Sequence, residues 1–421
     1  MRVLYISYFY PPLGGPAALR AVKTVKYLSR AGIVCDVITV KDLEYVYWDE
    51  SLLAECAEDR IFRTRSLDPM ALTPKTGSGK SGKASKLYMN TPEKMKLLVR
   101  RAYPIDNKIG WVPFLLQAGR EALAETDYDL IYVSLGPFSS ALGAYQLSRE
   151  SGLPLVLDLR DYWNLLSDYI LQATPLHRKF SLYWEEKVYR HASLIVTATQ
   201  GIGEDAARHF GQELAKKMIT VYNGWDEEDF RDLPDLKKQK GFTFAYFGAI
   251  YARRTLKHFY AALKRLREEN SLPENTRVWL VGNFFREANE EIKNSGISDI
   301  IQIIPQLEHN AALANMHAAD ALLLVINSSS PRGTLTSKIF EYLRAQKPIL
   351  AMVPRHKEAA GLLRWQGQDL ICAMESADSI YNCLKRVFAQ GVKEYSIPWE
   401  LERSRQVGLL ANRLSSLVQD N

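Results

Sequence analysis

The sequence predicts an α/β protein built from two Rossmann-like, doubly wound parallel-sheet domains that face a cleft. Its 421 residues exceed one ordinary domain, which usually has about 150. A hydrophobic content of 47% and a charged content of 24% are typical of a globular chain rather than a disordered or coiled-coil one. Short apolar runs alternate with helical patterns from end to end, which indicates parallel sheets covered on both faces.

The first domain is expected to cover residues 1–222. Its opening apolar run is followed by a Pro/Gly turn and then by a helical pattern of Leu19, Val22, Val25 and Leu28 that ends at Gly32. Strands are predicted at residues 3–8, 35–40, 130–134, 155–158 and 194–198.

The pattern restarts after residues 219–224, and a second domain is expected over 223–395. Strands are predicted at residues 242–247, 277–281, 300–304, 321–326 and 349–352, with a helix at 255–269. The charged stretch 226–240 predicts an exposed linker. Residues 396–421 form a third segment with an amphipathic helix at 399–418. Ligands of such sheets bind at the carboxyl ends of the strands, so we expect an active site built from loops of both domains.

Composition excludes several classes of protein. The four cysteines form no CxxC pair and have no histidine at ligand spacing, which argues against a disulfide framework or a structural zinc site and suits a reducing compartment. No apolar run approaches the ~18 residues of a membrane-spanning helix. The N-terminal apolar run reaches Pro11-Pro12 too early for a signal peptide, so we interpret it as a strand of the mature protein.

The formal charge of +6 is unevenly distributed. Residues 64–108 contain ten Lys/Arg and three Asp/Glu, or +7, which leaves −1 for the rest. Gly77 to Lys83 has the spacing of a phosphate loop, but Ala84 replaces the Ser/Thr and no strand precedes it, so a flexible basic surface loop is predicted. Residues 95–102 predict a basic amphipathic helix that either lies on an anionic membrane or packs on the domain. Nucleic-acid binding is not expected, because the segment lacks interleaved aromatic residues.

Two loops of the first domain carry candidate site residues. Gly14 and Gly15 stand at a strand-to-helix turn and either approach an anion or only form a tight turn. Their spacing is not GxGxxG, which disfavours a nicotinamide or flavin cofactor. Asp158, Arg160 and Asp161 follow an apolar strand; they either face the cleft or include an Asp–Arg pair that fixes the loop.

The densest motif lies at residues 331–347. A Gly/Thr/Ser loop leads into a helix that Ser337 can cap, with free N–H groups that suit an anion. Lys338 and Glu341 share one helix face, where a cation suits a diphosphate and a carboxylate suits ribose hydroxyls. The alternative is an exposed ion pair.

Taken in order, these motifs resemble those of a bacterial glycosyltransferase of the B-type fold, specifically glycosyltransferase family 4. The resemblance includes the residues from Pro11 to Arg20, the Arg160–Trp163 element, residues 222–226, 246–248 and 337–343, and the helix after Trp399. It implies transfer of a sugar from a UDP-, GDP- or dTDP-sugar to a glycan or lipid-linked acceptor, with retention. It also implies a C-terminal helix that returns to the first domain and no obligatory metal.

The resemblance assigns roles residue by residue. Glu341 matches the second glutamate of the family's Glu-x7-Glu motif, whereas Gly333 replaces the first. The predicted donor-binding residues are Gly14, Gly15, Gly248, Arg254, Thr334, Leu335, Thr336, Ser337, Lys338 and Glu341. The family's first-domain histidine is missing from residues 135–140, so Asp161 and Arg160 are the catalytic candidates.

The resemblance also suggests a place in the cell. The domain of residues 1–222 would be the acceptor side and that of 223–395 the donor side, in a cytoplasmic enzyme of surface-polysaccharide or lipopolysaccharide assembly. The basic segment 64–108 is a possible contact with the anionic inner membrane surface. Two alternatives remain: a nucleotide-sugar epimerase of the same fold, and a non-catalytic sugar-nucleotide-binding or scaffold protein.

Overall fold

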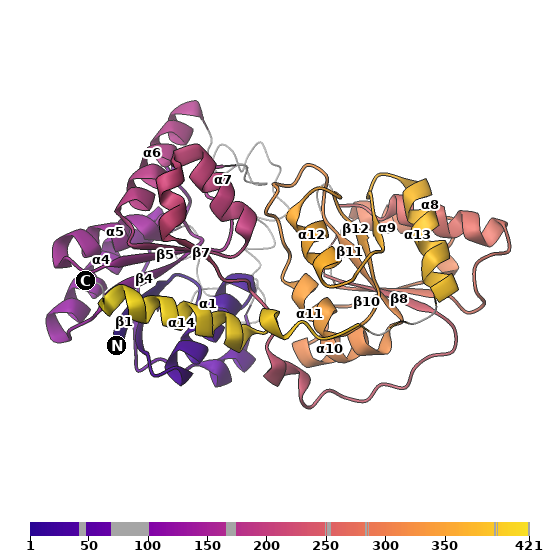
Figure 1. The fold of residues 1–421 in the computed structure, drawn as a ribbon, viewed down its shortest axis with the longest axis horizontal. Coiled ribbons are helices and arrows are strands. Elements are labelled where there is room, and N and C mark those ends of the chain that lie inside the picture. The colour runs from indigo at the N-terminus through magenta and orange to yellow at the C-terminus, as the bar shows by residue number, and fades with distance from the viewer. Residues whose placement is uncertain are drawn as a thin grey trace. The chain divides into compact units, whose positions relative to one another are not determined.

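The computed structural model describes residues 1–41, 48–68, 101–165, 174–248, 250, 254–282, 284, 286–390, 393 and 395–419. The chain divides into two compact units (Figure 1). The first unit contains Met1–Asn223 together with Ser404–Asn421, and the second contains Gly224–Arg403.

The first unit is built on a parallel sheet of seven strands in the order β3-β2-β1-β4-β5-β6-β7. The strands are β1 (Arg2–Ser7), β2 (Val34–Val40), β3 (Arg60–Thr64), β4 (Leu130–Leu135), β5 (Leu155–Leu159), β6 (Leu194–Thr197) and β7 (Met218–Thr220). The strand order reverses between β1 and β4, which are hydrogen-bonded neighbours. Loops after such a pair leave the sheet in opposite directions, and the crevice between them is where doubly wound folds bind ligands.

Helices cover both faces of this sheet. They are α1 (Pro16–Arg30), α4 (Val112–Glu125), α5 (Ser140–Ser151), α6 (Pro175–His191), α7 (Gln200–Phe210) and α14 (Arg403–Gln419), with the short turns η1 (Glu50–Glu55), η2 (Ile109–Trp111) and η3 (Gln212–Lys217). Val407, Leu410 and Leu414 of α14 recur on one helix face and are buried in the same cluster as Val3 and Tyr5 of β1. The predicted return of the C-terminal helix to the first domain is therefore confirmed.

The second unit has a parallel sheet of six strands in the order β10-β9-β8-β11-β12-β13. Its strands are β8 (Thr243–Phe247), β9 (Arg277–Val281), β10 (Ile301–Ile304), β11 (Ala321–Val325), β12 (Ile349–Met352) and β13 (Ile371–Cys372). The helices are α8 (Lys257–Glu268), α9 (Arg286–Lys293), α10 (His309–Ala318), α11 (Lys338–Arg344), α12 (Glu358–Trp365) and α13 (Ala377–Gln390), with the turns η4 (Glu227–Phe230), η5 (Ser298–Ile300) and η6 (Trp399–Leu401). The predicted fold class is confirmed by both sheets.

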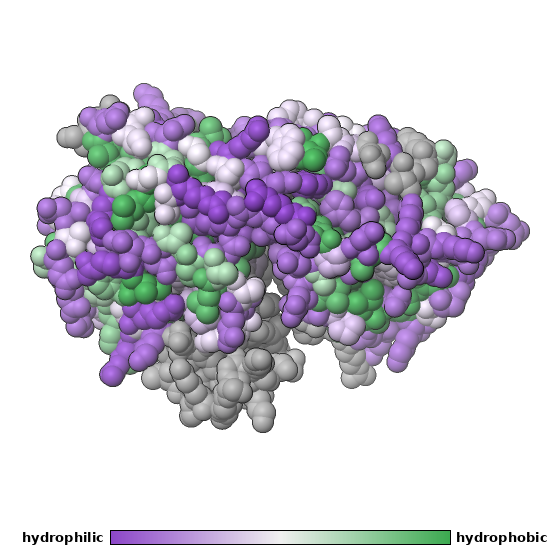
Figure 2. Space-filling view, turned by 90° about the horizontal axis from the view of Figure 1, so that it is seen from below, coloured by the Kyte–Doolittle hydropathy of each residue, from purple (hydrophilic) through white to green (hydrophobic). Residues whose placement is uncertain are grey.

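Hydrophilic residues dominate the face drawn in Figure 2, with smaller hydrophobic patches between them. Within the described residues, no helix combines the length and the apolar character needed to cross a bilayer. Most of the basic segment, residues 69–100, lies outside the described part of the chain, and with it the predicted loop 77–83 and most of the amphipathic helix 95–102. Two of its counted charges do not face solvent, because Lys108 and Asp68 are buried together as an ion pair of 2.7 Å.

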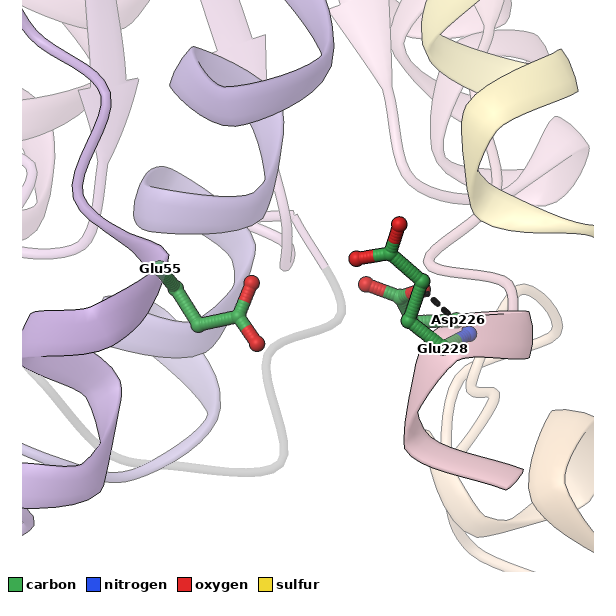
Figure 3. Close-up of side chains that lie close together, drawn as sticks. All are labelled: Glu55, Asp226 and Glu228. Carbon is green, nitrogen blue, oxygen red and sulfur yellow. Dashed lines mark hydrogen bonds between the residues drawn. The ribbon is translucent and has the colours of Figure 1, made fainter. Parts of the chain in front are cut away.

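The prediction of an exposed linker at 226–240 is wrong at its beginning. Asp226 and Phe230 are buried, and Glu227 forms a salt bridge of 2.6 Å with Arg344 of α11. The Asp226 carboxylate accepts the Glu228 N–H at 3.0 Å, drawn as a dashed line in Figure 3, and so caps η4. Figure 3 also draws Glu55, which belongs to the first unit and pairs there with Lys23 and Lys26 of α1.

Candidate active site

The loop between β1 and α1 carries Gly14 and Gly15. Gly15 precedes α1 with φ 90° and ψ 174°, a backbone conformation that favours glycine because it lacks a Cβ. Pro16 then occupies the first position of α1, where its missing N–H costs no helix hydrogen bond. The predicted tight turn is present, and it leaves the backbone N–H of Gly15 at the start of a 15-residue helix.

A buried network of hydrogen bonds fixes this loop in place. The Tyr8 hydroxyl donates to Asp68 at 2.5 Å, and Lys108 Nζ donates to the other Asp68 oxygen at 2.7 Å. Burial raises the pKa of the Asp68 carboxyl, but Lys108 and the hydroxyl donors outweigh it and lower the pKa. Further along the loop, Arg63 donates to the Pro11 carbonyl at 2.6 Å. The loop is therefore held by directional bonds rather than by apolar contacts alone.

The loop after β4 is held by Asp106. Its carboxylate accepts both the Ser139 N–H at 2.8 Å and the Ser139 hydroxyl at 2.7 Å, immediately before α5 begins. Burial raises the pKa of Asp106, and the hydrogen bonds from Ser139 oppose that rise. Asp106 thus supplies the negative charge at the N-terminus of α5, where the helix dipole favours an anion.

The Asp158 side chain is buried inside the first unit and does not face a cleft. It is fully buried in β5, and its two oxygens accept from Arg20 of α1 at 2.6 and 2.9 Å. The same guanidinium donates to the Val221 carbonyl at 3.1 Å and to Asn223 Oδ1 at 2.9 Å. The considered Asp–Arg pair therefore exists, but its arginine is Arg20 and not the neighbouring Arg160.

Arg160 extends from the end of β5 toward the loop after β4. Its Nε donates to the Leu135 carbonyl at 3.2 Å. The guanidinium lies against Gly136, where an added Cβ would come within 2.6 Å of Nε. Gly136 therefore provides the space for the arginine, and the predicted catalytic residue Arg160 links the β4 and β5 loops.

Asp161 is exposed at the tip of the same loop, where its carboxylate accepts the Tyr162 N–H at 2.9 Å. The residues after it anchor the loop to α6 and α7: Tyr162 to Asp205 (2.8 Å), Trp163 to Ser181 (3.1 Å) and Asn164 to Glu185 (2.9 Å). Asp161 therefore combines an exposed carboxylate with a fixed backbone, which suits a residue that positions a reacting group.

In the second unit, Gly248 follows β8 with φ +113°. The Lys338 side chain lies directly over it, since an added Cβ would meet Lys338 Nζ and would come within 2.6 Å of Cε. Lys338 Nζ also lies 5.2 Å from the centroid of the Tyr246 ring. Two predicted donor-binding residues that are ninety positions apart are thus brought into contact.

Arg254, Lys338 and Glu341 lie within electrostatic reach of one another. Burial and repulsion from Arg254 together lower the pKa of Lys338 to about 8, against the opposing effect of Glu341. Burial raises the pKa of Glu341, as does Asp229, while His309, Lys338 and Arg403 favour its ionised form. The cluster therefore presents two cations beside a carboxyl group whose pKa is raised.

The loop before α11 takes a different form from the predicted cap. Ser337 already has helical dihedrals (φ −55°, ψ −30°), and within the described residues its side chain makes no capping bond, so the prediction that Ser337 caps the helix is wrong. Backbone bonds from Ile339 to Thr336 and from Phe340 to Ser337 turn the chain instead. The Thr336 hydroxyl is buried and finds no hydrogen-bond partner among the described residues.

The structure thus groups the predicted residues within each unit. Gly248, Arg254, Lys338 and Glu341 form one cluster, and the loop 334–337 leads into the helix that carries two of them. In the first unit, Gly14 and Gly15 follow β1, while Arg160 and Asp161 follow β5. The sequence analysis missed Asp68, Asp106 and Lys108 as supporting residues, and noted Arg20 without its partner.

Two parallel α/β units with charged and glycine-rich loops at the carboxyl ends of their strands define the B-type glycosyltransferase architecture. Solved structures confirm this fold. An Anabaena protein, HepE, crystallised with UDP, has a TM-score of 0.60 at 15% identity and covers 100% of this chain and 98% of its own. The lipopolysaccharide outer core galactosyltransferase WaaB has a TM-score of 0.59 at 15% identity, covering 99% of each chain. A UDP-GlcNAc 2-epimerase from Methanocaldococcus jannaschii has a TM-score of 0.58 at 10% identity, covering 99% of this chain and 100% of its own.

The family model described as Glycosyltransferase Family 4 matches residues 76–229. The resemblance predicted from the sequence is therefore confirmed: the chain has the B-type fold and is similar to glycosyltransferase family 4 over residues 76–229. No curated protein matches the chain.

Proposed function

We propose that the enzyme transfers a sugar, with retention, from a nucleotide-sugar donor to a glycan or lipid-linked acceptor in surface-polysaccharide or lipopolysaccharide assembly. The observation that carries the proposal is the cluster of Gly248, Arg254, Lys338 and Glu341 at the carboxyl end of β8. The UDP bound to the Anabaena protein and the activity named for WaaB support a nucleotide diphosphate donor and a hexosyl group. Residues 223–395 would be the donor side and 1–222 the acceptor side.

The proposed donor site follows from charge. The leaving nucleoside diphosphate gains negative charge in the transition state, and fixed cations stabilise it most where water is excluded. Arg254 can hold two phosphate oxygens through its planar guanidinium, and Lys338 adds a second cation. Gly248 leaves room for the Lys338 side chain, which would carry its ammonium group to the phosphate, and the loop 334–337 adds backbone N–H groups and the Thr336 hydroxyl. Two cations offset a diphosphate, so the proposal includes no obligatory metal.

Glu341 would accept hydrogen bonds from the paired ribose hydroxyls. Its carboxyl lies one helix turn after Lys338, which places ribose and diphosphate contacts on one face of α11. The Glu341→Ala variant should bind donor nucleotide more weakly in titration calorimetry. Glu274→Ala is the matched control, because Glu274 is exposed and precedes β9, at the amino end of that strand, whereas the cluster lies at the carboxyl end of β8. Equal affinity in Glu341→Ala and the wild type would contradict the ribose role.

On the acceptor side, Asp161 would orient the acceptor hydroxyl, and Arg160 would hold the loop that carries it. With retention, the departing phosphate oxygen itself can take the acceptor proton, so Asp161 need not be the base. The Asp161→Asn variant should lose turnover while keeping donor affinity. Unchanged turnover would eliminate this role.

The donor's base and sugar can be identified by thermal stabilisation. A ligand that binds the folded state raises the melting temperature of the protein. Among UDP-, GDP- and dTDP-sugars, the donor should therefore give the largest increase in melting temperature. The likeness to the archaeal 2-epimerase over the whole chain also makes epimerisation a candidate. Product analysis by NMR distinguishes the two, because an epimerase converts the donor without an acceptor.

A further inference from the structure

Helix α6 of the first unit carries a row of large apolar side chains on its solvent side. Leu176, Phe180 and Tyr183 are 76%, 42% and 57% exposed. Their spacing of four and three residues places them along one line of the helix. The opposite face of α6 packs on the first unit through the buried residues Ser181, Glu185, Val188 and Tyr189. The exposed row is therefore additional to the face by which the helix joins the core.

Cations accompany this row. Lys179 is exposed and lies one helix turn before Tyr183, on the side of the row. Lys187 continues the row by one turn, with its Nζ 5.4 Å from the Tyr183 ring and 4.7 Å from the Trp184 ring. Such contacts keep the ammonium group above the rings instead of in an ion pair.

The acidic residues of α6 do not cancel these charges. Glu185 is buried, and Glu186 forms a salt bridge of 2.8 Å with Arg190. At the C-terminal end of α6, Arg149 and Lys217 lie near His191 and, with burial, lower its pKa, while Glu213 pairs with Arg190 at 2.7 Å. The outer side of α6 is therefore both apolar and cationic.

We propose that the outer face of α6, formed by Leu176, Phe180, Tyr183 and the adjoining cations, docks on an anionic lipid bilayer. Apolar and aromatic side chains of an interfacial helix enter the headgroup–acyl boundary, while neighbouring Lys and Arg contact acidic headgroups. The row from Leu176 to Tyr183 is about 10 Å long at 1.5 Å per residue. A strip of that length is too small to fill the area of at least about 1,000 Å² that a stable protein interface buries. The proposal uses no residue of the basic segment 64–108 and does not depend on the proposed sugar transfer.

The test is co-sedimentation of the full chain with phosphatidylcholine vesicles, with and without phosphatidylglycerol. We expect binding that requires phosphatidylglycerol and that falls about tenfold or more in Leu176→Ser/Phe180→Ser, because two large apolar groups no longer enter the lipid. Lys179→Glu/Lys187→Glu should weaken binding to a similar extent. Leu409→Ser is the matched control: Leu409 is 57% exposed on α14 and should leave binding unchanged.

Circular dichroism and the thermal melting temperature establish whether each variant is folded, and we expect all of them to be, since the four changed α6 side chains lie at the surface. Wild-type binding retained by both α6 variants would assign lipid contact to another surface and overturn the proposal. Failure of the wild type to bind acidic vesicles would also overturn it. So would a wild-type dimer that Leu176→Ser/Phe180→Ser converts to a monomer in light scattering, because the row would then be an interface between copies.

Discussion

The Asp158→Asn substitution would leave the Arg20 guanidinium buried beside a neutral amide. Both side chains of the pair are almost fully buried, at 5% and 0% exposure for Arg20 and Asp158, so water cannot replace the lost charge. Arg20 would keep its bonds to Val221 and Asn223 but lose its counter-ion. We therefore expect a large loss of stability in the first unit.

The magnitude follows from the burial. Removing one partner of a buried ion pair costs about 3–5 kcal/mol, because the remaining charge stays desolvated. For a unit of about 240 residues, each kcal/mol lowers the melting temperature by about 2–4 °C, so a decrease of roughly 6–20 °C is expected. The double variant Arg20→Met/Asp158→Leu removes both charges and should recover most of this loss, apart from about 1–3 kcal/mol for the unpaired Val221 carbonyl.

Thermal unfolding by circular dichroism measures both effects, with hydrogen exchange of the β5 amides as the local probe. Asp161→Asn is the matched control: it makes the same chemical change three residues later at an exposed site and should alter stability by less than about 0.5 kcal/mol. A decrease below about 2 °C for Asp158→Asn would refute the reasoning, since a buried unpaired arginine cannot cost so little. A double variant Arg20→Met/Asp158→Leu that is no more stable than Asp158→Asn would refute it too.

Three further changes test the site and its support. Gly248→Ala should weaken donor binding in calorimetry, because the new Cβ displaces Lys338. Gly367→Ala should bind donor normally: it introduces the same kind of backbone strain at φ +72°, but its Cβ would have no other atom within 4 Å. Equal losses of affinity in the two variants would leave backbone strain as the sole cause. Donor affinity should fall as pH rises through about 8, where Lys338 loses its proton, and Lys338→Arg should retain affinity because guanidinium stays charged; parallel pH profiles would contradict this. Burial raises the pKa of Glu185 from 4.5 to about 7, so its contribution to stability is present at acid pH and lost as pH rises toward 7. Glu185→Gln should therefore be more stable than the wild type at pH 8 by about 2–3 kcal/mol in urea unfolding, and equal pH profiles would exclude Glu185 as the cause.

The central strands were predictable because they are continuous apolar runs. The predicted bounds 277–281 and 349–352 are those of β9 and β12. The edge strand β3 was not predicted, since Arg60 and Arg63 interrupt its apolar residues and none of its residues is fully buried. The two-residue β13 is too short to leave a pattern. Edge position alone does not decide the outcome, because the edge strand β10 was predicted at 300–304 from its isoleucines.

The site was predictable where its residues are local in sequence. Lys338 and Glu341 share a helix face because they are three residues apart. The contact of Lys338 with Gly248 depends on the order of β8 and β11 in the sheet, which spacing along the chain does not reveal. The Ser337 cap failed for a different reason: capping needs extended dihedrals before the helix, and the turn at Thr336 is already helical at Ser337.

A count of charges along the sequence does not show which of them face solvent. Lys108 and Asp68 contributed to the count of a basic segment, yet they neutralise each other inside the first unit. Arg20 and Asp158 do the same across 138 positions. Each pair lies next to a loop that carries predicted site residues. Hydrogen bonds to charged groups fix the orientation of such a loop more closely than non-directional apolar contacts do. We therefore infer that these buried charges serve the orientation of the loops after β1 and β5, so their loss should change turnover as well as stability, whereas loss of an apolar core residue should act on stability first.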